Sequence, residues 1–147
     1  MTGDPVQRRL RDALYSEAML LADEARGYFD EAGRRETAEL DPLTRVLFSC
    51  ESLKVTTRIM HVVAWLLTQR AVDAGEIAPV TARLPAHRLG DAPESGDVED
   101  LPERARSLVE GSMDLYRRVQ RLDQAFSETV DSPVRAMQER LSRALGS

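Results

Sequence analysis

Apolar residues recur at spacings of three and four along most of this chain, and no alternating β pattern competes with them. This periodicity predicts an all-α protein. Capping residues followed by proline at 4–5, 41–42, 100–102 and 132–133 mark helix starts, and Gly33, Gly75 and Gly146 mark helix ends. The expected helices span residues 5–32, 42–74, 102–130 and 133–145.

The segment between the second and third predicted helices differs from the rest. Residues 78–100 are rich in proline, glycine and acidic side chains. Apart from a short helical turn near 79–83, we expect a long, mobile, negatively charged linker. The predicted fold is an antiparallel three-helix bundle with a short C-terminal fourth helix. Residues 1–131 form the bundle domain, and residues 132–147 form the tail.

The central helix carries two apolar stripes, although a helix at the edge of a bundle needs only one. The first stripe is predicted to face the bundle core and comprises Leu43, Val46, Cys50, Leu53, Thr57, Met60, Ala64, Leu67 and Ala71. The second is predicted to bind a second copy of the chain and comprises Phe48, Val55, Ile59, Val62 and Leu66. The alternative is a closed four-helix monomer, in which the last helix covers the second stripe.

Two groups of side chains are candidate partner-binding sites. Arg58, His61 and Trp65 share one flank of the central helix, and such cationic and aromatic residues are enriched in interface hot spots. Packing within the bundle is the competing explanation for this patch. The second candidate is the acidic linker, with Asp91, Glu94 and Asp97.

Composition narrows the functional classes. The 147 residues have a formal net charge of −5, which opposes a nucleic-acid footprint. A DNA-binding alternative depends on the basic clusters at 8–11 and 117–121. The run from Ile59 to Leu67 is too short and too interrupted to span a bilayer. The N-terminus lacks an apolar signal segment, so we expect a cytoplasmic protein.

The sequence contains no recognisable catalytic, cofactor or metal site. Neither His61 nor His87 has a glutamate three residues earlier, as carboxylate-bridged metal bundles require. Cys50 is the sole cysteine and is predicted to be a buried structural thiol. Phosphate-binding and nucleophile motifs are also missing. We therefore expect a non-enzymatic protein without a cofactor.

Three segments nevertheless resemble a known family. They are "YSEAMLLADEARGYFD" at 15–30, "RVLFSCESLKVTTRIMHVVAWLLTQRAVDAGEI" at 45–77 and "LPERARSLVEGSMDLYRRVQRLD" at 101–123. In these segments the chain is similar to the regulator of CtrA degradation (RcdA) family of bacterial proteins. The resemblance is weakest in the acidic linker and in residues 132–147.

The resemblance implies a dimeric three-helix bundle that acts as an adaptor for the ClpXP protease. Its implied partners are the ClpX unfoldase, or the response-regulator-like adaptor that primes it, and regulatory proteins degraded during the cell cycle. The tail is short and predicted to be helical, which departs from the flexible tail expected of such adaptors. A dimeric transcription co-regulator and a structural scaffold without a protease link are the alternatives.

Overall fold

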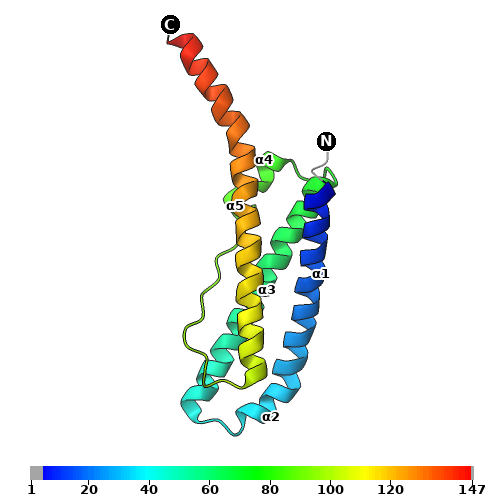
Figure 1. Ribbon diagram of the computed structural model, residues 1–147, viewed down its shortest axis with the longest axis vertical. Helices are drawn as coiled ribbons and strands as arrows, with labels where there is room; N and C mark the ends of the chain where they lie inside the picture. Colours follow the sequence, from blue (N-terminus) through cyan, green and yellow to red (C-terminus); the bar gives the residue numbers. More distant parts are fainter. Residues whose placement is uncertain (1–4, 147) are drawn as a thin grey trace.

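Three long helices run side by side in the structure, a computed structural model (Figure 1). It describes residues 5–146 and, within them, every side chain except those of residues 129–136 and 139. These residues contain helices and loops but no strand, which confirms the predicted all-α class. The helical elements are α1 (Pro5–Gly27), η1 (Tyr28–Ala32), α2 (Gly33–Thr37), α3 (Pro42–Asp73), α4 (Pro79–Ala82), η2 (Pro85–His87) and α5 (Glu103–Leu145).

The first helical segment continues past its predicted end at Gly33. A π-helical stretch, η1, leads from α1 directly into α2, and Gly33 keeps right-handed helical angles. A Cβ at this position would lie 2.7 Å from the Phe48 ring and 2.9 Å from the Tyr28 carbonyl oxygen. Gly33 therefore allows the close approach of α3 and does not end the helix.

The central helix α3 matches its prediction closely. The Asp41 carboxylate caps it by accepting a hydrogen bond from the Thr44 backbone amide at 3.2 Å, and Pro42 occupies the first turn. At the other end, Gly75 has a φ of +76°, which favours glycine. The predicted short turn is also present, as α4.

The prediction of a separate fourth helix was wrong. Residues 103–145 form one continuous helix, and the Ser132-Pro133 pair lies inside it (Figure 1). The proline ring suits the helical φ, but inside a helix it removes one backbone hydrogen bond and costs about 3 kcal/mol. A proline signal therefore favours a new helix start without requiring one. The C-terminal part of α5 projects beyond the three-helix body (Figure 1).

The assignment of the two apolar stripes on α3 was also wrong, because the two are reversed. The stripe predicted to bind a second copy is buried within the single chain, where it packs against α1 and α5. A side chain already enclosed in this way is inaccessible to a second copy. Its members are Phe48, Val55, Ile59, Val62 and Leu66.

Candidate functional site

The other stripe of α3 faces outward and is the most apolar exposed surface on that helix. We call it the exposed seam: Leu43, Val46, Cys50, Leu53, Thr57, Met60, Ala64, Leu67 and Ala71. All are exposed except Thr57 and Ala71, which are half-buried. Leu53 is 68% exposed and Met60 is 62% exposed. The Cys50 thiol is exposed too, contrary to the predicted buried position.

The spacing of this seam is that of a helix-pairing surface. Its members follow one another by three and four residues in strict alternation, which is the a/d pattern of a coiled coil. Large apolar side chains of this kind contribute about 1.5–3 kcal/mol each when fully buried. Monomeric proteins rarely expose large contiguous apolar patches, so the seam is a candidate binding surface.

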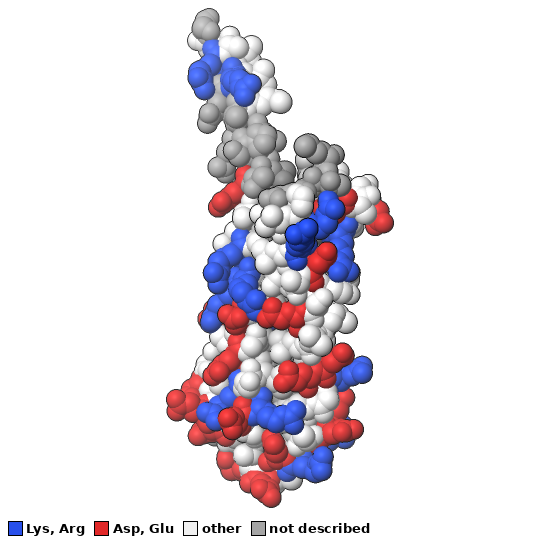
Figure 2. Space-filling model, turned by 45° about the vertical axis from the view of Figure 1, so that its right-hand side comes forward, with Lys and Arg blue, Asp and Glu red and all other residues white. Residues whose placement is uncertain are grey.

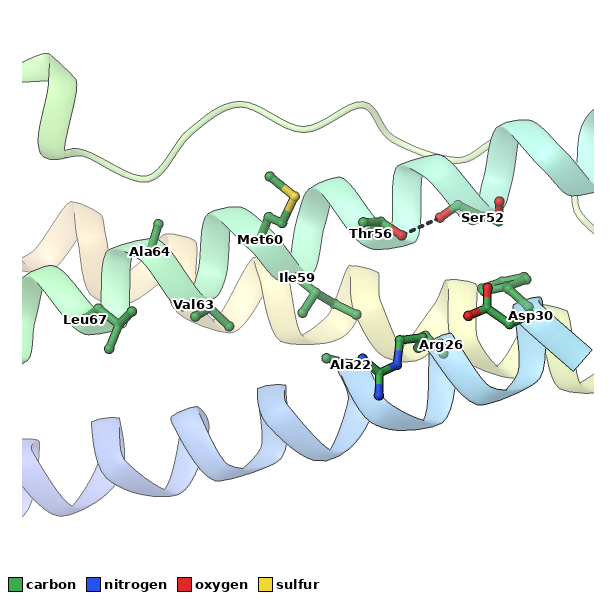
Figure 3. Close-up of a pocket in the computed structure, with 12 residues that line it drawn as sticks. Ala22, Arg26, Asp30, Ser52, Thr56, Ile59, Met60, Val63, Ala64 and Leu67 are labelled. Atoms are coloured by element: carbon green, nitrogen blue, oxygen red, sulfur yellow. Dashed lines mark hydrogen bonds between the residues drawn. The ribbon is translucent and has the colours of Figure 1, made fainter.

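A groove between α1 and α3 adjoins the seam (Figure 3). Its volume is about 600 Å³, and its lining is mainly aliphatic. Met60, Ala64 and Leu67 belong to both the groove and the seam. Figure 3 shows Arg26 and Asp30 on the α1 side, towards the end of the groove nearest Ser52. The groove has the form of a site for another apolar helix.

The predicted patch of Arg58, His61 and Trp65 is not a free surface. Arg58 is 2% exposed, and its guanidinium donates hydrogen bonds to Ser112 Oγ at 3.0 Å and to the Pro93 carbonyl oxygen at 2.9 Å. It also donates to Ser95 Oγ at 2.6 Å, and this serine donates to the buried Glu51 carboxylate. Burial lowers the pKa of Arg58, and the negative charge of Glu51 opposes that shift.

Trp65 is likewise buried in the interior of the bundle. Its indole nitrogen donates to Asp123 Oδ1 at 2.9 Å, and Asp123 also accepts two hydrogen bonds from Arg88, at 2.8 Å and 2.9 Å. Asp123 lies on α5, and its carboxylate therefore connects that helix both to α3 and to Arg88, where the irregular part of the linker begins. Both Arg58 and Trp65 were predicted to contact partners, and both instead hold the linker.

His61, the third member of the patch, is half-buried beside Gly90. A Cβ on Gly90 would lie 2.2 Å from His61 Nδ1, so the linker backbone passes directly over the imidazole. Tyr116 donates to the Gly90 carbonyl oxygen at 2.6 Å. Burial raises the pKa of the Tyr116 hydroxyl, and the negative charge of Asp91 raises it further.

Because of these contacts, the linker that was predicted to be mobile is anchored to the bundle. We call its residues 88–100 the strap. It has no regular structure, but hydrogen bonds to α3 and α5 hold it along the bundle. Asp91, Glu94 and Asp97 are exposed on it. Lys54 donates to the Glu94 carbonyl oxygen at 3.3 Å, which adds a further contact between the strap and α3. The three predicted acidic residues therefore share one anchored segment.

Metal-binding clusters and membrane-spanning helices are both absent from the described residues. It contains no group of three or more His, Cys, Asp or Glu residues placed to hold a metal ion. None of its helices combines the length and the apolar character needed to cross a membrane. Figure 2 shows charges of both signs on one face, with acidic side chains gathered towards the α2 end.

Comparison with known proteins fits this architecture. Residues 3–145 match the family described as "Protein of unknown function (DUF1465)". A crystal structure of RcdA from Caulobacter crescentus CB15 is similar, with 37% sequence identity and a TM-score of 0.67, over 80% of this chain and 90% of that one. No curated protein matches. The chain therefore belongs to the DUF1465 family and, by its identity and coverage, to the family of RcdA.

Proposed function

We propose that this protein is a non-enzymatic adaptor that tethers regulatory proteins to the ClpXP protease for cell-cycle-linked degradation. The observation that carries the proposal is the 37% identity to RcdA, which extends over 90% of that chain. The proposed partners are the ClpX unfoldase, or the response-regulator-like adaptor that primes it, and a regulatory protein cargo.

The arrangement of surfaces supports a tethering role. A tether increases the effective concentration of cargo beside the protease, which requires two separate binding surfaces on one body. The bundle offers an apolar seam on α3 and an acidic, hydrogen-bonded strap. We assign partner binding to Asp91, Glu94 and Asp97 on the strap. Arg58 and Trp65 then act indirectly, because they position that segment.

We also propose that the chain forms a homodimer through the exposed seam. The heptad spacing suits pairing of α3 with α3 of a second copy about a two-fold axis. This differs from the sequence-based prediction only in the face used. Leu53 and Met60 flank Thr57, the middle residue of the seam, and lie at the centre of the contact region that we propose.

The adaptor role is tested by reconstituted degradation with purified ClpXP, priming adaptor, cargo and ATP. The test variant carries Asp91→Asn, Glu94→Gln and Asp97→Asn. We expect it to slow cargo degradation by about tenfold, because a loss of about 1.4 kcal/mol in binding corresponds to that factor. The matched control carries Glu24→Gln, Glu31→Gln and Glu39→Gln, which neutralise three exposed acids outside the strap.

The outcomes test the strap assignment separately from the adaptor role. Equal rates for the strap variant and the control would reject the strap assignment. If the wild-type protein does not accelerate degradation of any family cargo, the adaptor role itself is rejected, and a scaffold without a protease link replaces it.

A further inference from the structure

The exposed seam combines large and small side chains in a spacing that is the same in both directions. Ala74, the C-cap residue of α3, continues the seam, and the steps from Leu43 to Ala74 are three and four residues in alternation, beginning and ending with three. An antiparallel copy of α3 therefore presents a matching row. The large members are 46–80% exposed, and they are Leu43, Val46, Leu53, Met60 and Leu67.

Antiparallel pairing sets a small side chain against a large one in every layer of one register. The facing pairs are Leu43 with Ala74, Val46 with Ala71, Cys50 with Leu67, Leu53 with Ala64, and Thr57 with Met60. Such matching lets facing layers interdigitate at an even distance between the helices. A shift of one heptad sets Leu43 against Leu67 or Cys50 against Ala74, and the match is lost.

Parallel pairing sets each residue against its own equivalent instead. The layers at Ala64 and Ala71 then contain two small side chains, whereas those at Leu53, Met60 and Leu67 contain two large ones. Parallel two-stranded coiled coils favour branched aliphatic residues where this seam has small ones. We infer that two copies pair antiparallel through the seam, with Cys50 of each copy facing Leu67 of the other.

The distribution of charge favours the same orientation. Figure 2 shows acidic side chains gathered towards the α2 end, where Asp30 and Glu31 are exposed. The basic cluster at 8–11 lies near the opposite end, at the start of α1 (Figure 1). Antiparallel pairing brings the acidic end of one copy towards the basic end of the other. Parallel pairing brings two acidic ends together, which is unfavourable.

The orientation also determines where the acidic straps lie. The strap contacts the flank of α3 that carries Lys54 and Arg58, whereas α1 and its groove lie on the flank that carries Val63. A two-fold axis perpendicular to the paired helices keeps equivalent flanks on the same side. Both straps therefore lie on one face of the dimer, and a partner that binds both gains avidity.

The antiparallel arrangement rests on the proposed homodimer, and thiol trapping in the full-length chain tests it. The test protein carries Leu67→Cys and keeps Cys50, the sole natural cysteine. The single-thiol controls are the wild type and Leu67→Cys with Cys50→Ser. Antiparallel pairing leaves their equivalent thiols about 26 Å apart along the helices. Under mild oxidation, we expect covalent dimers of the test protein to form about tenfold faster than those of either control.

A second test protein keeps Leu67, so that the loss of this side chain does not decide the result. It carries Leu53→Cys and Ala64→Cys with Cys50→Ser, and antiparallel pairing brings these two positions within reach of a disulfide between copies. Its controls carry one of the two introduced thiols each. Equal far-ultraviolet circular dichroism of the reduced proteins establishes that each one is folded.

The orientation and the homodimer fail in different ways. Single-thiol controls that cross-link as fast as the test proteins overturn the antiparallel orientation and indicate a parallel seam dimer. Slow cross-linking of both test proteins also overturns the orientation. In that case, sedimentation equilibrium of the reduced wild type decides whether the homodimer itself fails or uses another face.

Discussion

Two long faces of α3 have the same periodicity, but one is buried and the other is exposed. The buried face steps through Phe48, Glu51, Val55, Arg58, Val62, Trp65 and Gln69, whereas the exposed seam contains no charged residue. The buried face of α3 therefore carries more charge than the exposed seam. Buried charges are tolerated where each has partners, as Glu51 and Arg58 do through Ser95. The apolar seam is the surface that we propose binds a second copy.

The largest expected effect comes from the charged part of the buried face. Arg58→Ala leaves the Glu51 carboxylate buried without the arginine network, and we expect it to lower the free energy of unfolding by about 3–5 kcal/mol. Urea denaturation followed by circular dichroism measures this. Arg121→Ala, at an exposed position on α5, is the control and should change stability by less than about 0.5 kcal/mol. Similar losses in both variants would show that Arg58 has no special structural role.

Two adjacent leucines give a sharper comparison of the faces. Leu66 is 1% exposed and Leu67 is 46% exposed. Leu66→Ala should cost about 2–5 kcal/mol of unfolding free energy, because it leaves a cavity in the core. Leu67→Ala should cost less than about 0.5 kcal/mol in dilute, monomeric protein. If both cost the same under these conditions, the assignment of inner and outer faces is wrong.

A smaller effect is expected where the buried face meets the first helical segment. The Tyr28 hydroxyl donates to the Glu36 carboxylate at 2.5 Å, and the Tyr28 ring lies 6.1 Å from that of Phe48. Tyr28→Phe should lower the unfolding free energy by about 1 kcal/mol at neutral pH.

The same tyrosine predicts a pH dependence. Burial raises the pKa of Tyr28 above its ordinary value of 10.0, and the hydrogen bond to Glu36 raises it further. A raised folded-state pKa gives stability that is complete below pH 10 and is lost as the pH rises towards the folded value. The wild-type protein should therefore lose more stability than Tyr28→Phe between pH 9 and 11. Parallel losses in the two proteins would contradict this account.

Local signals predicted the fold well. Asp41-Pro42 and Gly75 set the ends of α3 because caps and a left-handed glycine act within a few residues. Gly33 and Ser132-Pro133 gave wrong helix boundaries, because the same residues are also compatible with a helix that continues. At Gly33 the deciding factor is a tertiary contact with Phe48, which no local pattern reveals.

The candidate site was less predictable. Both stripes of α3 were visible in the sequence, but periodicity alone does not say which of two apolar stripes faces the core. The cationic and aromatic character of Arg58, His61 and Trp65 made their flank of α3 resemble a binding surface. Their partners come from far along the chain, as with Ser95 and Ser112 for Arg58. The acidic strap was found because its composition is distinctive, but its anchoring depends on these distant contacts.

The central claim is that the exposed seam pairs with a second copy. Sedimentation equilibrium over a wide range of protein concentrations tests it, with wild type beside a variant carrying Leu53→Glu, Met60→Glu and Leu67→Glu. We predict that the wild-type mass rises from the monomer value of 16.4 kDa towards twice that value, while the variant remains monomeric with unchanged circular dichroism. A wild-type protein that stays monomeric at every concentration, or a variant that dimerises equally well, would contradict the account.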